Sequence, residues 1–122
     1  MYSEEKYPLQ DKTGKIIGLC IEIHKILGKG LLEIVYKDAL EFEFKTNKIP
    51  YEREKEYNII YKGHQLLHKF YADFIVFEKI ISEIKCTRNL AEEHYSQVIN
   101  YLSISKCLVG LVVNFGEESF KN

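Results

Sequence analysis

The stretch FYADFIVFEKIISEIK, from Phe70 to Lys85, decides the fold. Two runs rich in Ile, Val, Phe and Tyr flank the polar pair Glu78-Lys79, which is the composition of a half-buried β-hairpin. If the reversal centres on Glu78, Asp73 lies directly opposite Glu83, with Cβ atoms about 5 Å apart. Because alternate strand residues share a face, Lys85 projects on the same side as Glu83. The hairpin therefore gathers two carboxylates and an ammonium at one end of an apolar ribbon.

The two carboxylates indicate a cation site. At this distance they repel each other unless a positive charge separates them, because a charge removed from water needs a partner. Mg²⁺ or Mn²⁺ would meet that need, since such hard ions take one or two carboxylates together with water and substrate phosphate. The ammonium of Lys85 suits a phosphate or a metal-activated water. An acid–lysine pair across a hairpin is also a common surface feature worth at most about 1 kcal/mol, so the triad alone leaves both interpretations open.

A motif upstream favours the cation site. Asp73, nine intervening residues and then Glu83-Ile84-Lys85 resemble the signature of the PD-(D/E)XK nucleases. The stretch GLLEIVY, from Gly30 to Tyr36, resembles the motif of the small GxxExxY proteins, which are placed in the same superfamily. The similarity extends from about residue 16 to residue 116. One departure is that Tyr71-Ala72 precede Asp73 with no proline, which affects the expected loop geometry and leaves the chemistry intact.

The resemblance implies a metal-dependent nuclease. The metal ligands it implies are Glu33, Asp73, Glu83 and the backbone carbonyl of Ile84, and the catalytic residues are Lys85, Glu83, Asp73 and Gln97. Lys85 would orient or deprotonate the attacking water and stabilise the charge that develops on the phosphate. Gln97 would help to position water or phosphate. Without the resemblance, Glu33 is an acid favourably placed near a helix N-terminus and Gln97 a polar residue on a helix surface.

The expected partner is nucleic acid, with DNA favoured over RNA, and no membrane. Tyr36, Arg53 and Lys55 are the candidate contacts. Arg53 and Lys55 alternate with Glu52, Glu54 and Glu56, a pattern that is equally typical of a solvated edge strand. The net charge of −1 excludes a strongly basic, non-specific binder, so affinity must come from a local patch, a metal or a partner. A homodimer or a subunit of a larger complex would supply the area that so small a domain lacks.

The remaining chain predicts an α/β fold in the order ααβββαβ, a mixed sheet flanked by helices. This order resembles the restriction-endonuclease-like core of the PD-(D/E)XK fold. Apolar residues at helical spacing predict helices from Thr13 to residue 27, over 31–47, and to about Ser105 after a capping box at Asn89–Glu92. Strands are expected over 51–62, in the hairpin and over 108–113, the last covered on both faces. We expect one domain over 1–122, with an irregular lead-in at 1–12 and a polar tail at 117–122.

Composition narrows the class of protein. With 46% hydrophobic and 29% charged residues, the chain is an ordinary globular domain with one core. No apolar run approaches the roughly 20 residues needed to cross a bilayer, and the first residues lack the form of a signal peptide, so we expect a cytoplasmic protein. Three cysteines without CxxC spacing indicate neither disulfides nor zinc. The competing hypothesis is a non-catalytic nucleic-acid-binding or assembly module that retains the fold.

Overall fold

A central sheet organises the protein, and the computed structural model describes residues 9–120 and 122. The helices are α1 (Gln10–Leu27), α2 (Glu33–Thr46) and α3 (Glu92–Ser105). The strands are β1 (Tyr51–Tyr57), β2 (Ile60–Tyr61), β3 (His64–Gln65), β4 (Phe70–Val76), β5 (Ile80–Lys85) and β6 (Val109–Asn114). The main sheet has the order β1-β4-β5-β6, and only β5 and β6 pair in parallel within it. The predicted mixed α/β sheet is therefore confirmed.

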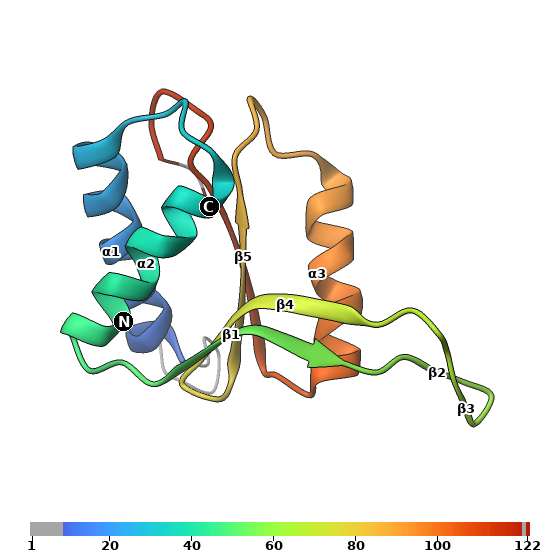
Figure 1. Cartoon of the computed structure of the whole chain (residues 1–122). Helices are drawn as coiled ribbons and strands as arrows, with labels where there is room; N and C mark the ends of the chain where they lie inside the picture. Colours follow the sequence, from blue (N-terminus) through green and yellow to red (C-terminus); the bar gives the residue numbers. More distant parts are fainter. Residues whose placement is uncertain (1–8, 121) are drawn as a thin grey trace.

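Helices cover both faces of this sheet, with α1 and α2 on one side and α3 on the other (Figure 1). Each side has its own cluster of buried apolar residues. On the α1–α2 side the cluster includes Ile16, Tyr36, Phe44, Phe74, Ile84 and Phe115. On the α3 side it includes Phe70, Ala72, Ile75, Ile81, Val98 and Val112. Residues of β5 alternate between the two clusters, which is why this strand reads as almost continuously apolar.

The hairpin register agrees with the sequence prediction. Val76 pairs with Ile80 and Phe74 pairs with Ser82, so the reversal centres on Glu78 and one further step sets Asp73 opposite Glu83. Phe77 and Glu78 make the turn with φ angles of 55° and 63°. Such positive angles are usually taken by glycine or asparagine, which explains why the sequence carries only a weak turn signal.

The sheet forks at Asp73. Pairing between β4 and β5 extends only from Val76 to Phe74, and Figure 1 shows β1 and β4 running across β5. Ala72 belongs to the α3-side cluster whereas Phe74 belongs to the α1–α2 side, although residues two apart on a regular strand share a face. The two faces of β4 therefore exchange sides of the sheet at Asp73. The faces of the neighbouring strand β1 do the same at Glu54, whose φ is 53°. This exchange directs Asp73 into the fork between the strands.

Several boundaries differ from those expected. Helix α1 begins at Gln10, so residues 10–12 are helical and not an irregular lead-in; residues 1–8 lie outside the described part. The first strand ends at Tyr57, and the short β2–β3 hairpin follows it. Helix α3 begins at Glu92, and His94 Nδ1 accepts a hydrogen bond from the backbone N–H of Ala91 (2.9 Å) where we expected the Asn89 box.

The C-terminal tail, expected to be polar, contributes an apolar contact, because Phe120 packs against His24 and Phe115.

Within the described residues, none of the helices combines the length and apolar character that crossing a bilayer requires.

Gly116 marks a close approach that a side chain would disrupt. A Cβ atom there would lie 2.2 Å from the carbonyl oxygen of Thr87 and 2.4 Å from its nitrogen, and backbone cannot rotate away as a side chain can. We expect Gly116→Ala to lower the free energy of unfolding by about 2–3 kcal/mol in urea titrations. Gly18→Ala is the control, since no atom outside the adjoining residues and backbone of its own helix lies within 4 Å of the added Cβ, and alanine favours the helix. Equal stability of the two variants would contradict this account.

Candidate functional site

Two acidic side chains hold the fork together. The backbone N–H of Asp73 donates to Glu83 Oε2 (3.0 Å), and the backbone N–H of Ile84 donates to Asp73 Oδ2 (2.8 Å). These two hydrogen bonds replace the backbone pairing of the strands at the point where β4 separates from β5. Unlike a flexible surface pair, both carboxylates are therefore oriented by backbone donors of the opposite strand. The structure thus brings together the two residues that the hairpin register placed opposite each other.

Burial and proximity alter the protonation of Glu83. Burial, together with the neighbouring carboxylate of Asp73, raises the pKa of Glu83 from 4.5 to about 8. In the absence of a bound cation Glu83 therefore holds its proton to higher pH than an ordinary glutamate does. A cation beside it would favour the charged form, because an opposite charge lowers the pKa of a carboxyl group.

Lys37 is the site residue that sequence reasoning missed. Its Nζ donates to Asp73 Oδ1 (2.9 Å) and also pairs with Glu54, and its side chain is buried. Burial acts to lower the pKa of Lys37, but hydrogen bonds to Glu54 and Asp73 outweigh it and raise the pKa. The available signal was spacing: Lys37 follows Glu33 by four residues, so α2 presents both on one face.

Glu33 is the first residue of α2 and faces the same charges. Although Glu33 is an exposed residue, partial desolvation raises its pKa, as does the carboxylate of Asp73, while the ammonium groups of Lys85 and Lys37 oppose the shift. Cys86, which follows Lys85, donates from Sγ to the carbonyl oxygen of Leu31 (3.3 Å) and so ties the end of β5 to the turn before α2. Burial and the Glu33 carboxylate raise the pKa of Cys86, which disfavours a nucleophilic thiolate.

The remaining predicted site residues lie on β5 and α3. Ile84 has a fully buried side chain, and its neighbour Lys85 is the last residue of β5. Gln97 is an exposed residue of α3, and Tyr101, one turn further, is partly buried and stacks on Phe70 with ring centroids 3.9 Å apart. The pKa of Tyr101 is raised by burial and by the carboxylates of Glu83 and Asp73. Its phenol therefore lies in the field of the carboxylate pair, on the α3 side of the sheet.

The candidate contacts to nucleic acid are engaged within the protein. Tyr36 is fully buried, stacks on Phe115 and donates its hydroxyl proton to the carbonyl oxygen of Gly28 (2.5 Å). The expectation that Tyr36 touches nucleic acid is therefore corrected: it orders the turn that leads into α2. Arg53 pairs with Asp38 (2.8 Å) and Glu41 (2.9 Å) on α2, and Lys55 pairs with Glu52 (2.8 Å). Nucleic-acid binding by Arg53 and Lys55 stays a prediction.

The donors suit a hard cation, although no metal centre is assembled among them. Asp73, Glu83 and Glu33 offer carboxylate oxygens, the ligand type that Mg²⁺ and Mn²⁺ prefer. In the part of the chain that the structure describes, no three His, Cys, Asp or Glu residues stand close enough to hold a metal ion. The ammonium of Lys37 contacts Asp73 instead. The chemistry of the donors fits a metal, and binding one would require Glu33 and Lys37 to adjust.

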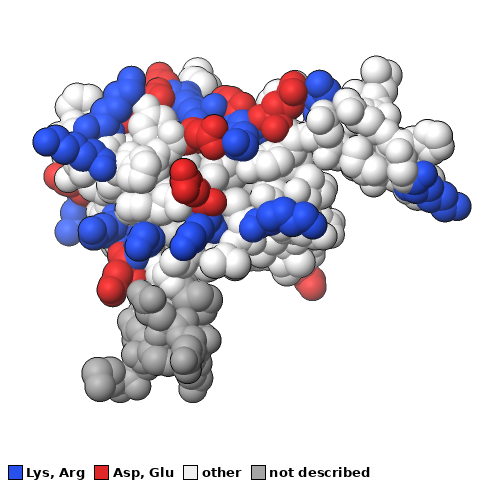
Figure 2. All heavy atoms as spheres, turned by 90° about the horizontal axis from the view of Figure 1, so that it is seen from below, with Lys and Arg blue, Asp and Glu red and all other residues white. Residues whose placement is uncertain are grey.

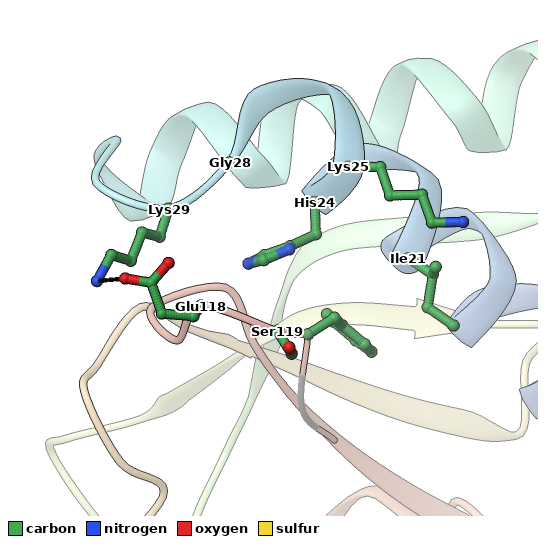
Figure 3. A pocket seen from close by; sticks show the side chains of 8 residues that line it. Ile21, His24, Lys25, Gly28, Lys29, Glu118 and Ser119 are labelled. Carbon is green, nitrogen blue, oxygen red and sulfur yellow. Dashed lines mark ion pairs between the residues drawn. The ribbon is translucent and has the colours of Figure 1, made fainter.

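A separate pocket of about 400 Å³ lies between the end of α1 and the tail (Figure 3). His24 Nε2 donates to the carbonyl oxygen of Glu117 (2.8 Å), so this nitrogen carries the ring proton. Lys29 and Glu118 form an ion pair at the rim (2.5 Å). None of the predicted site residues lines this pocket, so we do not assign it to the same chemistry.

The raised pKa of Glu83 predicts how stability depends on pH. Between about pH 4.5 and 8 the folded protein keeps a proton that the unfolded chain releases, so stability should fall as pH rises. The slope is at most about 1.4 kcal/mol per pH unit. Urea unfolding in EDTA should show this slope for the wild type and a flatter one for Glu83→Gln. Glu78→Gln, in the exposed turn, is the control, and an unchanged slope in Glu83→Gln would refute the assignment.

Comparison with known proteins identifies a family. A family model described as the PD-(D/E)XK nuclease superfamily matches residues 10–122. Searches among curated proteins and among solved structures found no significant match. The superfamily part of the resemblance seen in the sequence is confirmed, and the narrower resemblance to GxxExxY proteins stays a prediction.

Proposed function

Because the chain belongs to the PD-(D/E)XK nuclease superfamily, we propose that it hydrolyses phosphodiester bonds in nucleic acid with the help of Mg²⁺ or Mn²⁺. The observation that carries this proposal is the carboxylate pair at the fork. Asp73 and Glu83 are oriented by backbone donors, and burial together with their mutual proximity raises the pKa of Glu83. A pair that is costly in the absence of a cation is well suited to bind one.

The proposed ligands are Asp73, Glu83 and Glu33, with the backbone carbonyl of Ile84. When bound there, a divalent cation would polarise a phosphate oxygen and lower the pKa of a bound water. Lys85 then orients the attacking water and stabilises the negative charge that grows on the phosphate oxygens as the new P–O bond forms and the P–O bond to the leaving oxygen breaks. Gln97 positions the same water or a phosphate oxygen from α3.

Lys37 completes the site in its metal-free form. Its ammonium lies 2.9 Å from Asp73 Oδ1 and supplies the positive charge that the acidic fork needs before a cation arrives. Glu54 of β1 also forms an ion pair with that ammonium. We therefore assign Lys37 to positioning of the carboxylates, and we expect its contact with Asp73 to weaken when the cation binds.

We propose further that the chain is a GxxExxY protein and that it acts on DNA in preference to RNA. We also propose that it works in the cytoplasm, as a homodimer or as a subunit of a larger complex. The motif from Gly30 to Tyr36 supports the first part, because Tyr36 orders the turn before Glu33. The net charge of −1 supports the last, because a partner can supply the excess of positive charge that the chain lacks.

Calorimetric titration with Mn²⁺ tests the proposal most directly. We expect saturable binding by the wild type and at least about a tenfold loss of affinity in Asp73→Asn, which removes one ligand charge. The matched control is Asp38→Asn, which removes an exposed acid from α2 outside the site. Cleavage of plasmid DNA and of single-stranded RNA should follow the same order. Equal Mn²⁺ binding by Asp73→Asn and the wild type would refute the ligand assignment.

The second candidate function is a non-catalytic nucleic-acid-binding or assembly module. Two observations favour it. Among the described residues, no three potential metal ligands stand close enough to hold an ion, and the ammonium of Lys37 forms an ion pair with Asp73. Binding of nucleic acid without Mn²⁺-dependent cleavage of either substrate would establish this alternative.

A further inference from the structure

An arm projects from the sheet beyond the edge of the domain (Figure 1). We call residues 58–69 the arm; it contains β2 and β3, which pair Ile60 with Gln65 and Tyr61 with His64. Its apolar side chains are unusually accessible: Leu67 is 89% exposed, Ile60 60% and Tyr61 59%. Exposed apolar side chains gathered on one short segment favour an interaction site there.

Helix α3 also exposes two apolar side chains among polar ones. Tyr95 and Ile99 lie one helical turn apart and are 42% and 65% exposed, whereas Val98 between them is buried against the sheet. Helix α3 and the arm lie on the same side of the molecule, away from α1 and α2 (Figure 1). The exposure of Leu67 and Ile99 shows that the two surfaces do not cover each other within one chain.

The two surfaces carry opposite charges. The arm has no Asp or Glu and contains Lys62 in its turn and Lys69 at its base. Helix α3 contains Glu92 and Glu93 and no Lys or Arg. In Figure 2 the outer part of the arm is white and blue, with no red atoms. Opposite charges on two apolar surfaces favour their contact, whereas two arms of the same sign repel each other.

We propose that the arm of one chain packs on α3 of a second copy, and that a two-fold axis makes the contact reciprocal. Because each copy offers both an arm and a helix surface, one rotation buries both pairs at once, as in the closed dimers that predominate among homo-oligomers. Leu67, Ile60 and Tyr61 would cover Tyr95 and Ile99, with Lys62 near the acidic start of the helix. This inference does not depend on the proposed nuclease activity.

The composition of the arm favours a second copy over nucleic acid as the occupant. A segment that grips the phosphate backbone relies on several cationic side chains. Of the two lysines in the arm, Lys69 already pairs with Glu56 (3.3 Å). The arm instead exposes four large hydrophobic residues, Ile60, Tyr61, Leu66 and Leu67, and such side chains match the exposed Tyr95 and Ile99 of α3.

Sedimentation velocity over a concentration series tests the dimer. We expect the wild type to form a species of twice the 14.4 kDa chain mass. Leu67→Asp and Ile99→Asp should each raise the dimer dissociation constant by about tenfold or more, because each change places a charge in both reciprocal contacts. Phe42→Asp is the matched control: this α2 residue is 65% exposed, outside the proposed interface, and should leave the constant unchanged. Circular dichroism verifies that all three variants fold.

Mixing the two interface variants distinguishes arm-on-helix contact from other arrangements. A mixed pair of Leu67→Asp and Ile99→Asp retains one intact contact, so the mixture should associate more tightly than either variant alone. A monomeric wild type at all concentrations would overturn the proposal. So would a dimer that Ile99→Asp leaves intact, which would indicate arm–arm pairing. A monomeric wild type whose affinity for DNA falls in Leu67→Asp would assign the arm to nucleic acid instead.

Discussion

Lys85→Ala should reduce the rate of phosphodiester cleavage by about 100- to 10,000-fold while leaving Mn²⁺ affinity within about twofold. Lys85 follows Glu83 by two residues on β5, so it reaches the site from the same strand without being one of the proposed ligands. Lys85 is expected to orient the attacking water and to stabilise the charge on the phosphate. Both interactions stabilise the transition state more than they contribute to metal binding. The loss should therefore appear in kcat.

The measurement combines single-turnover cleavage at saturating Mn²⁺ with calorimetric titration of the same preparations. Lys79→Ala is the matched control, since it removes an exposed lysine from the turn before β5. Glu83→Gln should give the opposite pattern to Lys85→Ala, with metal affinity falling first. A Lys85→Ala enzyme that cleaves normally, or one that loses Mn²⁺ binding as Glu83→Gln does, would refute the division of roles.

The hairpin was predictable because its register depends on local information. Apolar runs on both sides of Glu78 can bury themselves only when they fold back at that point, and this alignment sets Asp73 opposite Glu83. Helix α2 and its first-turn Glu33 were predictable for a similar reason, because periodic apolar residues and the preceding glycines locate the helix.

Other features depend on long-range contacts that a single sequence does not specify. The buried residues of β1 and β4 change from the α1–α2 side to the α3 side of the sheet at Glu54 and Asp73. Arg53 is recruited by acids of α2, and the burial of Tyr36 follows from its stacking on Phe115, far along the chain. Only the folded chain shows that these side chains are already occupied.

Lys37 illustrates the same limit, and it leads to the second large effect. A lysine on a helix is normally solvated, and nothing in its neighbourhood along the sequence indicates that Asp73 and Glu54 will converge on it. Lys37→Met removes the charge and keeps most of the volume, which leaves the acidic fork without its counter-charge. We expect the free energy of unfolding in EDTA to fall by about 3–5 kcal/mol, because breaking a buried pair leaves its partner charges uncompensated.

Added Mn²⁺ should reverse much of that loss, and this reversal separates a role in the site from a purely structural one. In the wild type the cation must compete with the ammonium of Lys37 for Asp73, whereas in Lys37→Met the carboxylates are free to bind it. A tighter dissociation constant gives a larger stabilisation at the same Mn²⁺ concentration. Urea titrations with EDTA and with Mn²⁺ should therefore show a larger metal-induced shift for Lys37→Met than for the wild type. The control Lys45→Met, in the exposed last turn of α2, should match the wild type, and an equal shift in all three proteins would show that Lys37 does not share Asp73 with the metal.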